Sequence, residues 1–311
     1  MGFSRRDLLA AGGLAALGTV PALGEAAKPP RKRRVLRIAH ITDLHVQPEK
    51  GAALGMQRCL EHAQDHKPDL IVMGGDQVFD SLTVDRVRVA QLWDVYGSVL
   101  RANAAVPVVH VLGNHDVFGW GAIGRSPRES GYGKAFALDR MRLARGYYSF
   151  DRAGWHFVVL DSIAHARGLG YTARLDEDQF AWLTEDLARA KGRPTLLISH
   201  IPILSTSAFF FSANERTGNW HVPGAWMHID ARRIKDLFAQ CPTVVACLSG
   251  HMHMVDRLNY QGVRYFGNGA GCGNWWTGPL QGVGNGYGIV DLFSDGSVTN
   301  QYVEFPWKPM A

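Results

Sequence analysis

The stretch Val108-Val109-His110-Val111-Leu112-Gly113-Asn114-His115-Asp116 sets three polar residues behind an apolar run of the kind found in buried strands. Four other segments repeat this pattern. Their apolar runs are Val35–Ile41, Leu70–Met73, Leu196–Ile198 and Val244–Leu248. The polar patches that follow these runs are Asp43-Leu44-His45, Gly74-Gly75-Asp76, Ser199-His200 and Gly250-His251-Met252-His253.

Strands that each end in Asp, Asn or His bring those side chains together at one edge of a sheet. Carboxylates, amide oxygens and imidazoles are hard and borderline ligands, which suit divalent first-row metals. Five such strand ends in one chain therefore predict a two-metal site.

The order and content of the five patches resemble those of the calcineurin-like metallophosphoesterases, over about residues 35–255. The Gly-Asn-His-Asp and Gly-His-Met-His blocks are its most specific parts. The resemblance implies an α/β fold, a four-layer αββα sandwich of two mixed sheets with flanking helices. We expect one such domain over residues 35–311, with no internal repeat.

The resemblance also assigns metal ligands. Asp76 would bridge two ions and a hydroxide bound between them would attack phosphorus. The other ligands divide into two sets. Asp43, His45 and His253 would hold one ion, and Asn114, His200 and His251 the other. The ions would be divalent or mixed-valence, and Mn, Fe, Zn and Co all suit these donors.

His115 follows a ligand in the chain, so its ring cannot readily point at the same metal as Asn114. It would instead steady the transferring phosphoryl group or protonate the departing oxygen. Asp116 would then hold the His115 imidazole in the required tautomer. Phe79 stands where purple acid phosphatases carry a tyrosine ligand, so a tyrosinate–iron centre is not expected.

Helical patterns alternate with the early strands, and hairpin patterns come later, which favours mixed sheets. We expect helices over 83–101, 176–190 and 232–239, and a hairpin over 147–161. Two segments, 119–133 and 205–227, look like insertions beside the predicted site. Their aromatic residues, with a later tryptophan, give candidate substrate contacts, namely Phe210, Trp220, His221 and Trp275.

The N-terminus is read as a targeting segment. Arg5-Arg6 precede a weakly apolar Ala/Gly/Leu stretch, which is typical of a twin-arginine signal over residues 1–27. Residues 28–34 form a basic linker, which we expect to be solvated and not to bind nucleic acid specifically. The alternative for residues 1–27 is an uncleaved membrane anchor, but the stretch is short and glycine-rich for a span, which needs about 20 apolar residues, and no span is expected in the mature chain. The four cysteines have no zinc-knuckle spacing, and no disulfide is expected.

These features together predict an exported phosphoric ester hydrolase that meets the twin-arginine export machinery and resides in the periplasm or outside the cell. A phosphodiester substrate is favoured, either a small molecule or a lipid, because no cluster of arginines near the motifs suits a dianionic monoester. The alternatives are a phosphomonoesterase of the same fold, a metal-dependent binding protein without turnover, and a nucleic-acid binder that uses the basic linker.

Overall fold

The first apolar run forms strand β1 (Arg34–Ile41), which lies at the centre of a five-stranded mixed sheet. The strand order is β13-β12-β1-β2-β3. Strands β2 (Leu70–Met73) and β3 (Val108–His110) run parallel to β1, whereas β12 (Gly286–Phe293) is antiparallel to it. Strand β13 (Val298–Glu304) pairs with β12 at the outer edge. This computed structural model describes residues 32–121, 126–166, 168, 170–211 and 216–310, so the predicted signal and residues 28–31 of the linker lie outside it.

A second, six-stranded mixed sheet has the order β10-β11-β9-β8-β5-β4. Its parallel centre consists of β5 (Trp155–Leu160), β8 (Thr195–Ser199), β9 (Val244–Ser249) and β11 (Val263–Asn268). Strands β4 (Tyr148–Arg152) and β10 (Val255–Tyr260) close its two edges in antiparallel pairing. A small hairpin, β6 (Ile163–Ala166) and β7 (Gly170–Ala173), stands apart from both sheets.

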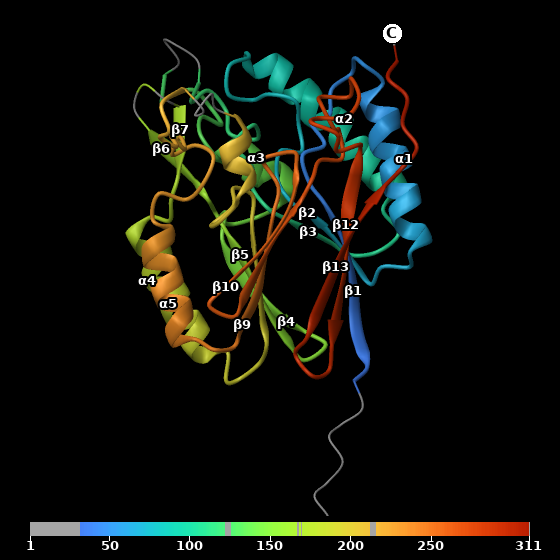
Figure 1. Ribbon diagram of the computed structural model, residues 1–311. Coiled ribbons are helices and arrows are strands. Elements are labelled where there is room, and N and C mark those ends of the chain that lie inside the picture. The colour runs from blue at the N-terminus through green and yellow to red at the C-terminus, as the bar shows by residue number, and fades with distance from the viewer. Residues whose placement is uncertain (1–31, 122–125, 167, 169, 212–215, 311) are drawn as a thin grey trace, which may run out of the picture. The chain divides into compact units, whose positions relative to one another are not determined.

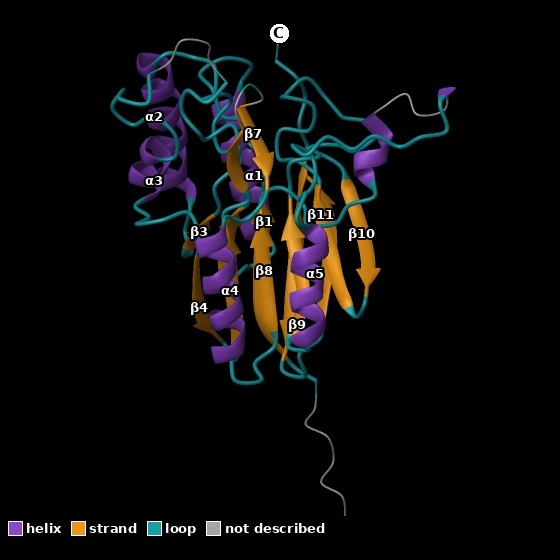
Figure 2. Cartoon of the chain, turned by 90° about the vertical axis from the view of Figure 1, so that its left-hand side faces the viewer, coloured by secondary structure: helices purple, strands orange, loops and turns teal. Residues whose placement is uncertain are grey.

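Helices cover the outer faces of both sheets, so the expected four-layer sandwich is confirmed (Figure 1). On one side lie α1 (Ala52–Asp65), α2 (Arg86–Asn103) and the short α3 (Ala135–Met141). On the other side α4 (Glu177–Arg189) and α5 (Ala231–Gln240) lie over the six-stranded sheet, roughly along its strands, as Figure 2 shows. Among the described residues, no helix is long and apolar enough to span a bilayer.

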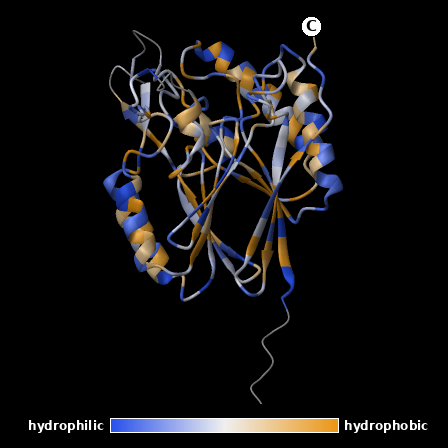
Figure 3. Cartoon of the chain, in the orientation of Figure 1, coloured by the Kyte–Doolittle hydropathy of each residue, from blue (hydrophilic) through white to orange (hydrophobic). Residues whose placement is uncertain are grey.

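Three buried apolar layers hold these elements together. The layer between the sheets includes Ile38, Val72, Phe157 and Ile198, all fully buried. The other two layers lie between each sheet and its helices. Figure 3 shows the consequence for the surface helices, which carry apolar residues on one face and polar residues on the other.

Side-chain caps fix where two of the helices begin. The Asp176 carboxylate accepts from the N–H of Gln179 at 2.8 Å and starts α4, while Asp85 accepts from Arg88 at 2.9 Å and starts α2. An N-cap of this kind contributes about 1 kcal/mol to helix stability. The described part of the basic linker packs on the body, since the Lys32 ammonium lies 4.3 Å from the Phe293 ring centroid.

Candidate metal centre

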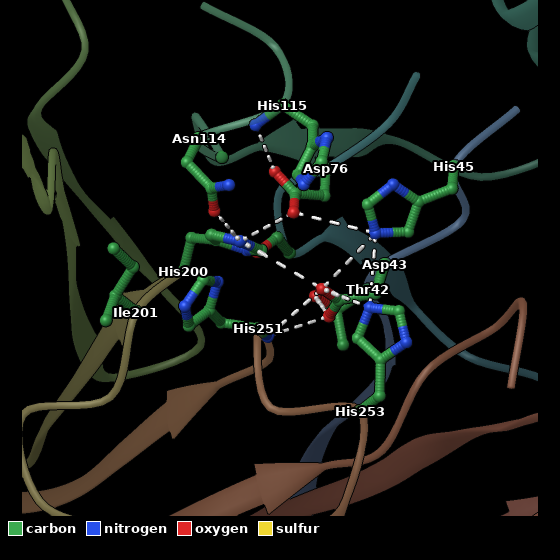
Figure 4. A network of polar contacts seen from close by, with 12 residues as sticks. Thr42, Asp43, His45, Asp76, Asn114, His115, His200, Ile201, His251 and His253 are labelled. Carbon is green, nitrogen blue, oxygen red and sulfur yellow. Dashed lines mark hydrogen bonds and ion pairs between the residues drawn. The ribbon is translucent and has the colours of Figure 1, made fainter. Parts of the chain in front are cut away.

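The five polar patches meet at one edge of the sandwich, where the carboxyl ends of β1, β2, β3, β8 and β9 come together (Figure 4). Each of these strands runs parallel to at least one other strand of the set, so their polar extensions leave the sheets in the same direction. The seven residues expected as ligands are therefore neighbours in space, although up to 210 positions separate them in the sequence, from Asp43 to His253.

Asp43, His45 and His253 form the first group. The Nε2 atoms of the two histidines lie 3.1 Å apart, and the Asp43 Oδ1 atom lies 3.3 Å from His253 Nε2 and 3.9 Å from His45 Nε2. Both rings and the carboxylate are buried. Three donor atoms therefore face a common point.

His200, Asn114 and His251 form the second group. His200 Nε2 lies 3.2 Å from the Asn114 side-chain oxygen, and the His251 ring packs edge-on against the His200 ring at 5.2 Å. Asp76 belongs to both groups, because its Oδ2 atom is 3.2 Å from His200 Nε2 and 3.6 Å from His45 Nε2. Its other oxygen, Oδ1, accepts from the backbone N–H of His115 at 2.8 Å, which fixes the carboxylate between the two groups.

The spacing of the donors fits metal coordination. Nitrogen and oxygen ligands about 2.0–2.2 Å from one ion lie about 3–3.5 Å from each other in octahedral or tetrahedral geometry. The contacts of 3.1–3.3 Å around His45, His253 and Asp43 have this spacing, as do those around His200. Two nitrogens that face each other at 3.1 Å also need either a proton or a cation between them. The donor set thus fits two borderline or hard divalent ions.

Backbone carbonyls orient the imidazole rings through their Nδ1 atoms, on the side opposite Nε2. His253 Nδ1 donates to the Gly273 carbonyl at 2.8 Å and His200 Nδ1 donates to the Gly74 carbonyl at 3.0 Å. His45 Nδ1 faces the Phe79 carbonyl at 3.4 Å. These contacts fix the tautomer that leaves each Nε2 atom free to bind a metal.

The charges of the site act strongly on one another. Although burial lowers the pKa of His200, the carboxylates of Asp76 and Asp43 outweigh it and raise that pKa to about 9. His251 is further from the carboxylates, and burial lowers its pKa to about 3. A buried cluster with this charge pattern is typical of a functional site.

Five of the seven ligand residues have a left-handed backbone, namely Asp43, His45, Asp76, His251 and His253, with φ between 43° and 68°. Non-glycine residues rarely adopt this conformation, and such strain gathers at functional sites. Glycine is required beside them. A Cβ atom on Gly250 would collide with Thr42 and the Asp43 carboxylate, and one on Gly113 would collide with Asp76.

The structure corrects the role expected of Asp116. Its carboxylate is buried and accepts from the backbone N–H groups of Asp76, Gln77, Val78 and Gly113, at 2.9–3.3 Å. It therefore braces the turn that carries Asp76 and does not orient the His115 ring. The carboxylate near that ring belongs to Asp80, whose Oδ1 atom lies 3.9 Å from His115 Nδ1.

His115 itself lies at the edge of the metal groups, where one of its ring nitrogens comes within 4.8 Å of ligand atoms of His45 and Asp76. Its ring centroid is 4.8 Å from that of His45, in an edge-on arrangement, and the side chain is 25% exposed. The ring thus lies between the buried ligands and the open cavity above them.

A cavity of about 190 Å³ opens over the site. Of the expected substrate contacts, only Trp275 lines it, with its ring 3.9 Å from that of His45. The side chains of Phe210 and Trp220 are more than 60% exposed, and neither they nor His221 line the cavity. The cavity wall also includes Trp226, from the segment 205–227 that was expected beside the site, and two residues that were not predicted, Met252 and Leu280.

The cysteines and a second, larger hollow elsewhere in the molecule bear on where the site lies. All four cysteines are free. The buried Cys272 sulfur lies 3.9 Å from His253 Nδ1, and Cys272 could form a metal-holding group with His45 and His253, whose ligand atoms lie within 4.8 Å of one another. A larger hollow of about 540 Å³ between α4 and α5 contains no histidine or cysteine. Size alone therefore does not locate the site, whereas convergent ligands do.

Comparison with known proteins agrees with this geometry. Residues 36–255 match the family model described as calcineurin-like phosphoesterase. The 3′,5′-cyclic-nucleotide phosphodiesterase alr5338 of Nostoc is 24% identical over 88% of this chain and 94% of its own length. The cyclic AMP phosphodiesterase CpdA of Escherichia coli K12 is 26% identical over 91% and 92%. A dimetal phosphatase from Danio rerio shares the fold, with a TM-score of 0.64 and 15% identity over 88% of this chain and 98% of that one.

The matched region contains every strand end that carries a predicted ligand, from Asp43 to His253. The chain belongs to the calcineurin-like phosphoesterase family and is a metal-dependent phosphoester hydrolase.

Proposed function

We propose that this protein is an exported phosphodiesterase with a dinuclear metal centre. The observation that carries the proposal is the position of Asp76 Oδ2, which lies 3.6 Å from His45 in one ligand group and 3.2 Å from His200 in the other. One carboxylate shared in this way would hold two ions close together.

The ligand residues would divide the work. Asp43, His45 and His253 would hold one ion, Asn114, His200 and His251 the other, and Asp76 both. Bound ions in such a centre activate water as a nucleophile near neutral pH and offset the charge that develops on phosphate. The protein's own contribution is to keep the donors in place, through the carbonyl contacts of the histidines and the bracing of the Asp76 turn by Asp116.

His115 would act on the substrate. Its ring lines the cavity directly over the metal groups, and its backbone N–H already holds the bridging carboxylate. A proton on the ring nitrogen that faces the cavity would pass to the departing oxygen as the phosphorus–oxygen bond breaks. Asp80, on the Nδ1 side, would stabilise the charged ring before that transfer.

A diester is favoured over a monoester. Among the described residues, no arginine or lysine lines the metal cavity, so the second negative charge of a monoester would have no side-chain partner there. The two relatives named above are described as cyclic-nucleotide phosphodiesterases, which also act on diesters. A binding protein without turnover is disfavoured, because all seven ligands and His115 are in place.

The test is a pair of hydrolysis rates. The purified protein, supplied with Mn²⁺, is assayed in parallel on bis-p-nitrophenyl phosphate and on p-nitrophenyl phosphate. We expect the diester to have the higher kcat/KM. A higher value for the monoester would reverse the preference, and no turnover of either ester would refute the proposal.

Export is the second part of the proposal. It is supported by Arg5-Arg6 and the weakly apolar residues behind them. We propose that the twin-arginine machinery carries the folded chain to the periplasm or beyond, where small-molecule or lipid phosphodiesters would be its substrates.

A further inference from the structure

A second cavity adjoins the metal cavity. It has a volume of about 350 Å³ and is lined by Lys50, Phe79, Asp80, His115, Trp275 and Thr277. His115 and Trp275 line both cavities. A substrate with its phosphate at the metal groups would therefore extend past His115 into this second cavity.

Two aromatic side chains give the second cavity flat, apolar walls. The Phe79 and Trp275 rings meet edge-on with centroids 5.6 Å apart, and both are only partly buried. Trp275 is held firmly, because its ring also packs on His45 and it has a left-handed backbone. Aromatic walls of this kind favour a flat, unsaturated ligand group.

Lys50 places a positive charge at the second cavity, and this charge has no ion-pair partner among the described residues, although the neighbouring Glu49 pairs with Arg88 at 2.5 Å. Lys50 directly precedes Gly51, the N-cap of α1, and a cation at that end opposes the helix dipole. Its backbone is left-handed, with φ 55°. Neither pairing nor helix stability accounts for a lysine at this position.

Asp80, the other charged residue in the second cavity, is engaged elsewhere. Its Oδ1 atom accepts from the backbone N–H of Leu82 at 2.7 Å and faces His115, and its Oδ2 atom accepts from the Thr83 hydroxyl. It forms no ion pair with Lys50. The lysine charge in this cavity is thus free to meet a ligand.

We propose that the second cavity binds the leaving group of the substrate, and that this group is a flat aromatic or heteroaromatic ring with a carboxylate or another electron-rich acceptor. Phe79 and Trp275 contact the ring, and Lys50 selects for the acceptor. His115 stands at the junction, where the bond to the leaving oxygen breaks. This inference rests on the proposed hydrolysis at the metal centre.

The test measures the binding of phosphinates, which carry one negative charge at phosphorus, as a diester does, and have only carbon–phosphorus bonds that the enzyme cannot hydrolyse. Dimethylphosphinate, methyl(phenyl)phosphinate and (4-carboxyphenyl)methylphosphinate are titrated calorimetrically into the metal-loaded full-length protein. We expect the phenyl ring to tighten binding by about two- to tenfold over methyl. The carboxylate should add about two- to fivefold, and this gain should shrink at high salt.

The decisive variant is Lys50→Gln, which should remove the gain from the carboxylate and keep the gain from the ring. Lys67→Gln is the matched control, since Lys67 is also exposed and left-handed (φ 53°) but lies before the amino end of β2, away from the site. It should bind all three ligands like the wild type.

The outcomes distinguish a failure of the leaving-group subsite from a failure of the proposed hydrolase. If dimethylphosphinate binds but the ring and the carboxylate add nothing, if no phosphinate binds although bis-p-nitrophenyl phosphate is hydrolysed, or if Lys50→Gln keeps the full gain, the leaving-group subsite is refuted and the hydrolase stands. If no phosphinate binds and bis-p-nitrophenyl phosphate is not hydrolysed, both the subsite and the proposed function are refuted.

Discussion

The bridging position of Asp76 gives the most direct test at the scale of single residues. Asp76→Asn keeps the shape of the side chain but removes the charge shared by the two ligand groups. We expect one bound metal ion or fewer and no measurable hydrolysis, by metal analysis and by the bis-p-nitrophenyl phosphate assay. Asp94→Asn, which removes an exposed ion pair between Asp94 on α2 and Arg140 on α3, should leave both the metal content and the hydrolysis unchanged. Two bound ions with ordinary turnover in Asp76→Asn would refute the bridge.

We expect His115 to act on the substrate and not to bind a metal, because its ring lines both cavities and its side chain is 25% exposed, although one ring nitrogen lies within 4.8 Å of ligand atoms of His45 and Asp76. His115→Ala should therefore retain both metal ions, while kcat falls by about 10²–10⁴-fold. The loss should be smaller for a p-nitrophenyl ester, whose leaving group needs little protonation, than for an alkyl ester. Equal losses on both esters would indicate that His115 positions the phosphoryl group and does not protonate the leaving oxygen.

Asp116 and Asp80 should respond differently to the same change. Asp116→Asn would set an NH₂ group against backbone N–H donors, and an unsatisfied buried donor costs about 1–3 kcal/mol in the free energy of unfolding. Asp80→Asn keeps an oxygen for its turn and should mainly lower kcat. Urea unfolding and kinetics on both variants would check this. A stable Asp116→Asn protein with the kinetic defect expected of Asp80→Asn would restore the sequence-based role of Asp116.

The ligands could be predicted from sequence because each directly follows an apolar strand, and parallel strands deliver their ends to one place. The direction of an individual side chain could not. Asp116 is adjacent to His115 in the chain, yet the turn points its carboxylate at the backbone of residues 76–78. Asp80, four residues after Asp76, approaches His115 only once β2 and β3 are paired.

Strand β1 buries a histidine whose titration should make stability depend on pH. Asn268 donates to His40 Nδ1 at 3.0 Å, which favours the neutral ring, and burial lowers the pKa of His40 to about 4. The unfolded chain, with an ordinary histidine pKa of about 6.5, binds this proton first, so stability falls as the pH decreases from 6.5 toward 4.

Relative to pH 7, the loss from His40 at pH 5 should be about 2 kcal/mol. His40→Gln keeps an acceptor for Asn268 and removes the titration. Urea unfolding at both pH values should show that the free energy of unfolding decreases less between pH 7 and pH 5 for His40→Gln than for the wild type. Titration of the metal ligands affects both proteins equally, so it does not contribute to this difference. Equal losses in the two proteins would show that His40 does not titrate as inferred.

Elements with a strong pattern were predicted well, and weakly patterned ones were missed. The helix expected over 176–190 is α4, and the hairpin expected over 147–161 is β4 and β5. Strand β10 was missed because an edge strand with Asp256, Arg257 and Asn259 has no apolar run. The hairpin of β6 and β7 has strands of only four residues, too short for a clear alternation.

At the scale of the whole molecule, the sandwich explains why the site needs the complete fold. Ligands come from both sheets, and the apolar layer between the sheets sets how far apart their edges lie. The sequence predicts this convergence because the five polar patches occur in the same order as in the calcineurin-like family. Metal identity depends on distances of a few tenths of an ångström and on metal supply, which residue types do not specify.

A site that forms only in the complete fold is well suited to an export route that carries folded proteins. The twin-arginine route carries folded proteins, and a chain whose ligands converge only after both sheets form would bind its metals before leaving the cytoplasm. Replacing Arg5 and Arg6 with lysine keeps the charge but removes the guanidinium pair that we propose the export receptor binds. We expect the variant to accumulate in the cytoplasm in an active, metal-loaded form, as measured by cell fractionation and hydrolysis in each fraction. The same substitution at Arg33 and Arg34, where the basic linker meets β1, is the matched control and should be exported normally. Export of the Arg5/Arg6 variant at the wild-type level would show that the chain uses another route, and retention of both variants would show that basic linker residues contribute to targeting.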